Sequence, residues 1–397
     1  MTFINPTFWI VAVVVYILLS IETSHKASLR FGFINLFALN LLLGWQIALG
    51  ALLGVTLFWG MVSLGLQYGA QKNQNKSLVG FSILAGVTVV FIFHKLNLQH
   101  SPWIETLQAL APWMRSDFFL TFLAGLSFSY IFVRCADALH CVFWKNCPLM
   151  GPLSLFGYLL PFHMLLSGPV NAYEEHLEMD RDAEPESVPS LDRVLLILNA
   201  ITTGLLYKFV VAESLRTYFY GANGEMTVSN WGDSAILALY VFFDFAGYSR
   251  VARGLGLLYR VPTPENFSAP FLSVSVTDFW TRWHMSMGQF VRRNLFTPIQ
   301  LNLVRAVGIK NAGWVSLVTM VVSFGFVGLW HRISWTWILW GVAMGLLMAL
   351  EKHVQTFAMR KGWNRSPWIG HALPWLGPVY TNTVLIISVR FVAEEIF

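Results

Sequence analysis

Uninterrupted hydrophobic runs dominate the pattern of this 397-residue chain. A helix that spans the hydrocarbon core of a bilayer needs about 20 predominantly apolar residues. A membrane β-barrel would instead show strands of alternating polarity, each about ten residues long. The runs therefore predict membrane-spanning helices, at about residues 6–21, 30–69, 78–95, 117–134, 150–170, 191–215, 232–249, 270–290, 313–330, 334–350 and 373–393.

Polar segments separate these runs, and the richest of them covers residues 174–186 with seven acidic side chains. We expect a solvated loop there rather than a calcium site, because the ligand spacing and turn glycine of a calcium loop are missing. No internal repeat or soluble segment is visible. The pattern predicts about 9–12 spanning helices in a single membrane domain over residues 1–397. Runs broken by glycine, proline, histidine or arginine are candidates for re-entrant or interfacial helices.

Composition agrees with a membrane protein, since 56% of the residues are hydrophobic and 12% are charged. A soluble domain has about 25% charged residues. The net charge of +5 would suggest nucleic acid in a soluble chain, but in a membrane chain it marks cytoplasmic loops. We expect a multi-pass protein of the cell (inner or plasma) membrane with no nucleic-acid partner. Lys26 and Arg30, which follow the first run, predict an external N-terminus, and the basic residues between Lys352 and Arg365 would then be cytoplasmic.

The three cysteines, Cys135, Cys141 and Cys147, lie six residues apart. A structural zinc site usually has four ligands, and a disulfide framework shows an even number of cysteines. We therefore expect small packing residues and no metal site.

Two stretches of the chain, residues 278–298 and 323–341, carry ionisable groups in apolar surroundings. Such groups are expensive in a membrane and call for an explanation. His331 separates two apolar runs, and a neutral imidazole can take a proton from a hydroxyl and pass it to a leaving group. A histidine hydrogen-bonded between helices, or lying at the lipid headgroups, is the plainer alternative. His284 stands 47 residues earlier, a spacing that allows the two rings to share one cavity.

Other polar groups lie in apolar runs as well. His163 and the segment 167–171 indicate a broken helix, since Gly168 and Pro169 disrupt backbone bonding. Asp244 is a candidate either for an ion pair with Arg250 or Arg253, one or two helical turns away, or for a direct part in the chemistry. The proline-rich segment 262–270 is expected to be a stiff structural connector.

Taken in order, four blocks of sequence resemble the membrane-bound O-acyltransferase (MBOAT) superfamily. The likeness is closest to its bacterial branch that modifies surface polymers, with alginate O-acetylation and teichoic-acid D-alanyl transfer proteins. It covers about residues 150–350, the expected catalytic core. The blocks are Leu166–Val170 (LSGPV), Phe243–Tyr248 (FDFAGY), Pro264–Phe267 (PENF) with Asp278–Ser286 (DFWTRWHMS), and Gly328–His331 (GLWH) with Trp337–Gly341 (WILWG).

The resemblance implies an all-α polytopic fold, with a ring of helices around a central funnel or tunnel. It assigns His331 as the catalytic histidine and His284 as the second one. Asp278, Arg282, Trp283 and Trp330 are then expected to bind substrate. Arg282, Arg292 and Arg293 could hold donor phosphates, although side chains lying at the lipid interface explain them as well.

The implied reaction moves a short acyl group, with acetyl favoured, from a cytoplasmic donor such as acetyl-CoA to an extracytoplasmic polysaccharide. No bound cofactor is expected. The implied partners are membrane lipid and either an extracytoplasmic acyltransferase or esterase-like protein or an acyl carrier protein. Lipid or protein acylation, D-alanyl transfer to teichoic acid, and a non-catalytic or transport role in a surface-polymer complex stay open. The chain departs from the family pattern at 171–176, 292–294, 300–302 and Arg332, which concerns the substrate more than the reaction.

Overall fold

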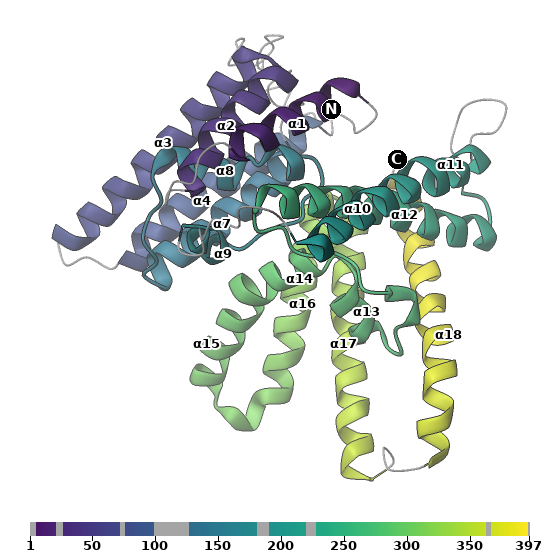
Figure 1. Ribbon diagram of the computed structural model, residues 1–397. Helices are drawn as coiled ribbons and strands as arrows, with labels where there is room; N and C mark the ends of the chain where they lie inside the picture. Colours follow the sequence, from purple (N-terminus) through teal and green to yellow (C-terminus); the bar gives the residue numbers. More distant parts are fainter. Residues whose placement is uncertain are drawn as a thin grey trace. The chain divides into compact units, whose positions relative to one another are not determined.

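The computed structural model describes residues 5–20, 27–71, 76–98, 127–180, 190–219, 228–362 and 367–395. Within these ranges the chain is helical and contains no β-strand (Figure 1), which confirms the all-α prediction. Part of the predicted run 117–134 and part of the acidic segment 174–186 lie outside the described residues. Lys26 and Arg365 lie outside them as well.

Seven helices among the described residues are long and apolar enough to cross a membrane. Two shorter apolar helices, Pro6–Ser20 and Ala27–Leu43, add to them. The seven are Trp45–Gly69, Lys76–Leu96, Leu191–Tyr218, Trp231–Tyr259, Ile309–His331, Trp335–Arg360 and Ala372–Glu395. The chain is thus polytopic as predicted, while the total of 9–12 spans stays a prediction.

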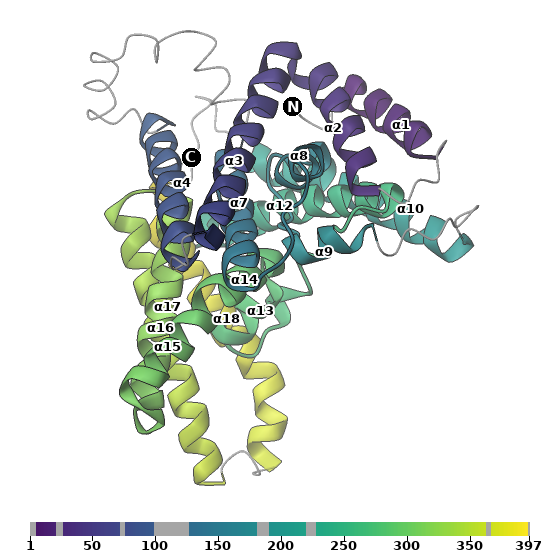
Figure 2. The same cartoon turned by 90° about the vertical axis from the view of Figure 1, so that its left-hand side faces the viewer.

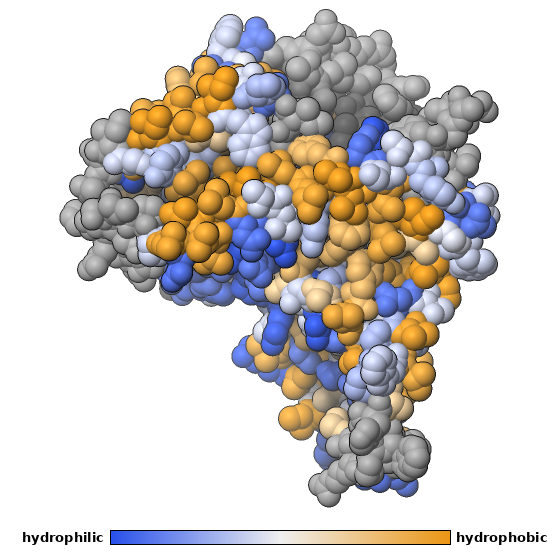
Figure 3. Space-filling model, turned by 45° about the vertical axis from the view of Figure 1, so that its right-hand side comes forward, coloured by the Kyte–Doolittle hydropathy of each residue, from blue (hydrophilic) through white to orange (hydrophobic). Residues whose placement is uncertain are grey.

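The surfaces of these helices are strongly apolar. Leu57 and Leu64 are 69% and 65% exposed on one helix, and Trp375 is 79% exposed on another. Hydrophobic side chains cover much of the face seen in Figure 3. A soluble monomer rarely exposes such extensive apolar patches, so these faces are suited to lipid.

The chain forms two compact units. The first comprises residues 1–201 and 251–264, and the second comprises residues 202–250 and 265–397. Both α10 (Leu191–Leu206) and α12 (Trp231–Tyr259) contribute residues to each unit. The prediction of one membrane domain stays a prediction, because two helical clusters can belong to one such domain.

The first unit is built on close packing between α2 and α8. A Cβ atom on Gly32 of α2 would lie 2.1 Å from the carbonyl oxygen of Leu153, so only glycine allows this approach. The side-chain amide of Asn35 donates to Leu160 and accepts from the backbone of Phe162. The helices of this unit are α1 (Pro6–Ser20), α2 (Ala27–Leu43), α3 (Trp45–Gln71), α4 (Lys76–Leu98), α7 (Phe128–Trp144), α8 (Pro152–Leu159), η2 (Phe162–Met164) and α9 (Tyr173–Glu178).

The predicted helix break is confirmed, because no helix covers residues 165–172, where the Gly168–Pro169 peptide bond is cis. The fully buried side chain of Arg134, which lies on α7, binds this segment through its guanidinium group. It donates to the side chain of Asn171 and to the carbonyl oxygen of Pro169. A buried charge needs such partners, and they fix the irregular backbone in place.

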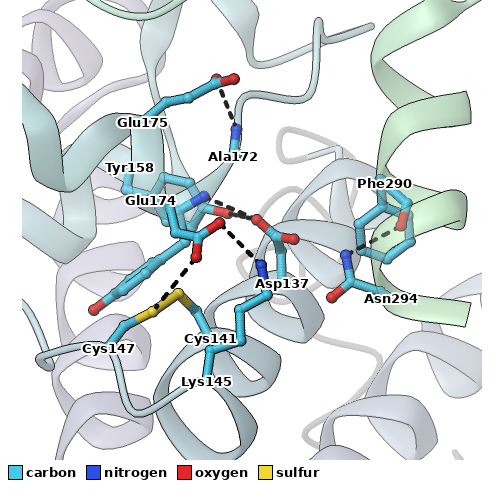
Figure 4. A network of polar contacts seen from close by, with 11 residues as sticks. Asp137, Cys141, Lys145, Cys147, Tyr158, Ala172, Glu174, Glu175, Phe290 and Asn294 are labelled. Carbon is cyan, nitrogen blue, oxygen red and sulfur yellow. Dashed lines mark hydrogen bonds and ion pairs between the residues drawn. A yellow bond between two sulfur atoms is a disulfide. The ribbon is translucent and has the colours of Figure 1, made fainter. Parts of the chain in front are cut away.

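The expectation for the cysteines was wrong for two of the three residues. Cys141 and Cys147 form a disulfide, while Cys135 is free and buried. The helix α7 ends at Trp144, so the chain turns back and brings the second thiol to the first. Figure 4 shows the surroundings, where Lys145 pairs with Glu174 at 3.0 Å. These two cysteines and Glu174 are the one group of possible metal ligands among the described residues, and the disulfide occupies both sulfur atoms.

A second polar cluster lies beside the disulfide, around the carboxylate of Asp137. Its Oδ2 atom accepts hydrogen bonds from the backbone of Tyr173 at 2.8 Å and from the hydroxyl of Tyr158 at 3.3 Å. The hydroxyl of Tyr173 in turn donates to the carbonyl oxygen of Pro148, at 3.0 Å. Burial raises the pKa of Tyr173 to about 12, so it remains a hydrogen-bond donor at neutral pH. The cluster therefore holds α9 against the loop that carries the disulfide.

In the second unit, α16 and α17 lie side by side (Figure 1 and Figure 2). Glycines allow their backbones to touch: a Cβ on Gly328 would lie 2.1 Å from the carbonyl oxygen of Trp337. A Cβ on Gly341 would lie 2.2 Å from that of Phe324. The helices of this unit are η3 (Tyr207–Ala212), α11 (Glu213–Phe219), η4 (Pro270–Leu272), α13 (Val276–Arg282), α14 (Met285–Val291), η5 (Arg292–Phe296), α15 (Thr297–Val307), η6 (Ile309–Asn311), α16 (Ala312–His331), α17 (Trp335–Arg360), α18 (Pro367–Val392) and η8 (Ala393–Glu395).

The predicted partner of Asp244 was wrong. This carboxylate forms an ion pair with Lys208 of η3. Gly247 lets the backbone of η3 approach α12, since a Cβ there would lie 2.7 Å from the backbone nitrogen of Lys208. Arg250 instead lies over the ring of Tyr207, and Arg253 donates to the carbonyl oxygen of Thr263.

Candidate functional site

The second unit contains a cavity of about 600 Å³, lined by residues of α12, α13, α14, η5, α16, α17 and α18. His284 and His331 both line it, together with Trp283. The cavity is otherwise largely apolar, with methionine, valine and aromatic side chains on its walls. Concave, mostly apolar cavities with a few convergent polar groups are the usual sites for small ligands, so this is the candidate active site.

His331 is the last residue of α16 and belongs to a cluster of indole rings. Its imidazole is stacked on Trp337, with ring centroids 4.8 Å apart and planes inclined by 24°. Trp340 lies nearly perpendicular to it at 6.2 Å. The residue as a whole is exposed. The helix ends at this residue, so part of the ring is left uncovered while one face is held by Trp337.

The chain turns sharply after His331 and begins a new helix. Ser334 caps α17 by accepting a hydrogen bond from the backbone of Trp337. Arg332 donates to the carbonyl oxygen of Glu395 at 3.1 Å. This side chain therefore anchors the turn to η8, which follows α18.

His284 joins α13 to α14 and is 7% exposed. Its backbone is left-handed, with φ of 45°, a conformation that is unfavourable for most L-residues. Its ring lies 4.7 Å from the ring of Phe245. Burial lowers the pKa of His284 to about 3, and the nearby His331 lowers it further as a second, smaller cause. The imidazole is therefore neutral at physiological pH.

The strained backbone at His284 is held by the PENF block, which the sequence presented as a connector. Asn266 accepts the backbone hydrogen bond of Met285 at 2.9 Å. Its side-chain oxygen accepts from the hydroxyl of Ser286, and its side-chain nitrogen donates to Ser249 of α12 at 3.0 Å. This buried network fixes the start of α14, and with it the direction of the imidazole.

Trp330 packs near both histidines. Its ring centroid is 6.1 Å from that of His284 and 5.0 Å from that of His331. Trp330 is 5% exposed and is not among the lining residues of the cavity. It is thus a buried packing partner common to the two imidazoles.

Asp278 and Arg282, both expected to bind substrate, do not line the cavity either. They form an ion pair with each other at 2.8 Å, one turn apart on α13. The other carboxylate oxygen of Asp278 accepts from the backbone of Val274. Arg292 does line the cavity and is exposed. Of the basic residues considered for the donor, Arg292 is therefore the one placed at the cavity wall.

Sequence reasoning missed several residues of this site. Trp337 and Trp340 belong to the block Trp337–Gly341, which contributes to the family resemblance. Nothing in the sequence shows that their rings pack around His331. Met320 and Ser323 recur with His331 at helical spacing along α16 and line the same wall. That helical spacing can be recognised in the sequence, whereas the residues that form the opposite wall of the cavity cannot.

The profile of the membrane-bound O-acyltransferase (MBOAT) family matches residues 146–389. The chain is 28% identical over 241 residues to the teichoic acid D-alanyltransferase of Bacillus subtilis (strain 168), covering 60% of this chain and 58% of that protein. It is 26% identical over 322 residues to the peptidoglycan O-acetyltransferase of Helicobacter pylori (strain ATCC 700392 / 26695), covering 76% and 57%. It is 26% identical over 337 residues to a probable alginate O-acetylase of Azotobacter vinelandii, covering 82% and 64%.

The chain spans less than two thirds of the length of these three relatives. The match and the apolar helices together identify a multi-pass protein of the cell membrane, in agreement with the predicted localisation.

Proposed function

This chain belongs to the membrane-bound O-acyltransferase family, as its sequence blocks predicted, and we propose that it is an O-acyltransferase of bacterial surface polymers. The acyl group is short, with acetyl favoured, and passes from a cytoplasmic donor such as acetyl-CoA to a hydroxyl group of an extracytoplasmic polysaccharide. The observation that supports this most strongly is the presence of both histidines on the wall of one cavity.

His331 is the general base in this proposal. Its imidazole takes the proton of the acceptor hydroxyl as the hydroxyl oxygen forms a bond to the acyl carbon. The carbon–sulfur bond of the donor thioester then breaks, and the proton passes to the leaving thiolate. Removing a positioned general base typically slows a reaction by a factor of about 10² to 10⁴.

His284 supports this base by remaining neutral. Its pKa of about 3 means that it carries no charge when His331 becomes protonated during the reaction. Two imidazolium groups close together would repel each other, which would raise the barrier. A neutral ring can instead donate one hydrogen bond and accept another, for example with the acceptor or the acyl carbonyl.

Arg292 is the proposed contact for an anionic part of the donor, because it lies on the cavity wall and is exposed. The predicted partners, an extracytoplasmic acyltransferase or esterase-like protein or an acyl carrier protein, belong to the same proposal. D-alanyl transfer to teichoic acid is the second candidate, favoured by the similarity to the Bacillus subtilis D-alanyltransferase.

The proposal is tested by measuring ester-linked acyl groups on surface polymers of cells that produce either the wild-type protein or His331→Ala. Mild alkali releases the esters, and mass spectrometry distinguishes acetate from D-alanine. We expect His331→Ala to lose about 100-fold or more of the activity. His353→Ala is the matched control, since this histidine is exposed on α17 and does not line the cavity. Full acylation by His331→Ala, at equal protein level, would refute the catalytic assignment.

A further inference from the structure

The carboxylate of Glu351, in the second unit, accepts four hydrogen bonds. Glu351 of α17 accepts from the backbone nitrogens of Val276 and Thr277, at 2.8 and 2.9 Å. It also accepts from the hydroxyl of Thr277 at 2.7 Å and from that of Tyr380 at 3.0 Å. One side chain thus joins α13, α17 and α18, and all three helices contribute residues to the cavity wall.

The start of α13 depends on these bonds. The first backbone N–H groups of a helix have no partner within the helix. In α13 the hydroxyl of Ser275 accepts from the backbone of Asp278 at 3.0 Å. Glu351 accepts from the two residues before it, Val276 and Thr277. A negative charge at this position also opposes the helix dipole favourably, so a neighbouring helix completes the N-terminus of α13.

The other end of α13 leads directly to the site. The helix ends at Arg282, and Trp283 and His284 follow it. The residues after His284 are fixed by Asn266, as described above. Glu351 fixes the opposite end of the same short segment, so the segment that carries His284 is held at both ends.

Glu351 itself lies on the helix that packs against the helix of His331. It lies on α17, and α17 touches α16 backbone to backbone at Gly328 and Gly341. His331 is the last residue of α16. A displacement of α13 relative to α17 would therefore change the spacing of His284 and His331 across the cavity.

We propose that Glu351 is a positioning residue, which sets Trp283 and His284 in place against His331. The proposal rests on the proposed function for its catalytic consequence, and on the four hydrogen bonds for its structural basis. Glu351 acts through α13 and does not contact the reacting groups itself.

The test compares Glu351→Gln with Lys352→Ala in the full-length protein. Glutamine keeps the size of the side chain but replaces one accepting oxygen with an NH₂ group, which faces the backbone donors of α13. Lys352 is the adjacent residue, and its side chain links α17 to Ser316 of α16 at 2.9 Å. Each variant removes one polar link between α17 and a neighbouring helix. The comparison therefore controls for a general loss of stability.

We expect Glu351→Gln to lower kcat by about 10- to 100-fold, because a misplacement of about 1 Å costs that much. The KM for the acyl donor should change less than threefold, as roughly expected when orientation rather than binding is lost. Lys352→Ala should keep kcat within about threefold of wild type, in keeping with a substitution away from the reacting groups.

Hydrogen–deuterium exchange of the peptide that covers residues 274–284 gives a readout that does not depend on activity. Exchange should become faster in Glu351→Gln and stay at the wild-type rate in Lys352→Ala. Wild-type kcat in Glu351→Gln, or unchanged exchange in this peptide, would overturn the proposal. If the wild-type protein transfers no acyl group from any thioester donor, the proposed function fails, and the exchange experiment alone then decides whether Glu351 holds α13.

Discussion

The imidazole of His331 is stacked on the indole of Trp337, with 4.8 Å between ring centroids and 24° between planes. His331 ends α16 and Trp337 lies in the first turn of α17, so the stack joins the two sides of the turn between these helices. An exposed side chain at a helix end samples several rotamers. The stack selects one of them, which is what a general base requires.

Replacing Trp337 with leucine should therefore lower kcat about tenfold, because the base is then correctly oriented for a smaller share of the time. Trp337→Phe should retain most of the activity, since a flat ring can still stack. Trp335→Leu is the control, because Trp335 lies on the same turn and is 77% exposed. Polymer acylation in membranes measures all three variants. Equal activity of Trp337→Leu and Trp335→Leu would show that the stack has no role.

Stability should fall in acid because of His284. Its folded-state pKa is about 3 and its unfolded value is about 6.5, so the unfolded chain binds more protons between these values. The stabilisation is fully present above about pH 6.5 and is lost progressively as the pH falls toward 3. The loss amounts to about 2 kcal/mol at pH 5. Thermal unfolding in detergent at pH 7 and pH 5 should show a smaller acid shift for His284→Asn than for the wild type. Identical shifts would contradict the buried, neutral imidazole.

The contact between α16 and α17 should not tolerate a methyl group. Gly341→Ala would place a Cβ 2.2 Å from the carbonyl oxygen of Phe324, and overpacking of this kind costs about 1–3 kcal/mol. Gly325→Ala is the matched control, because its Cβ would meet nothing within 4 Å. We expect a lower Tm for Gly341→Ala and an unchanged or slightly higher one for Gly325→Ala. A wild-type Tm in both variants would mean that the helices are farther apart than described.

The disulfide can be tested by counting thiols. The chain has three cysteines, so denatured, unreduced protein should take up one alkylating group, at Cys135, and reduced protein should take up three. Cys141→Ser should lower the free energy of unfolding by about 2 kcal/mol, the value expected for closing a loop this short. Three alkylated thiols without reductant would rule the bond out.

The apolar runs were enough to predict a helical membrane protein, because the bilayer sets the length and the polarity of each span. The apolar run 334–350 nevertheless predicts a helix that ends near residue 350, whereas α17 continues to Arg360. Glu351 and Lys352 looked like a polar break in the sequence. In the structure their side chains find partners on neighbouring helices, so the helix has no reason to end there.

The two histidines could be predicted as candidates, since ionisable groups among apolar residues are rare. Their common cavity depends on how α13 and α14 fold back toward α16, which no local pattern contains. The partner of Asp244 was predicted within its own helix, whereas Lys208 comes from a different segment. The sequence reveals which groups need partners more readily than it reveals the partners.

The glycine contacts between α16 and α17 also limit how the cavity can change its width. Two backbones in direct contact cannot slide or separate without breaking many short contacts at once, so His331, Trp337 and Trp340 stand on a rigid wall. Any change in the width of the cavity would therefore have to come from its other walls. The α16–α17 pair in this way keeps the orientation of His331 independent of such a change.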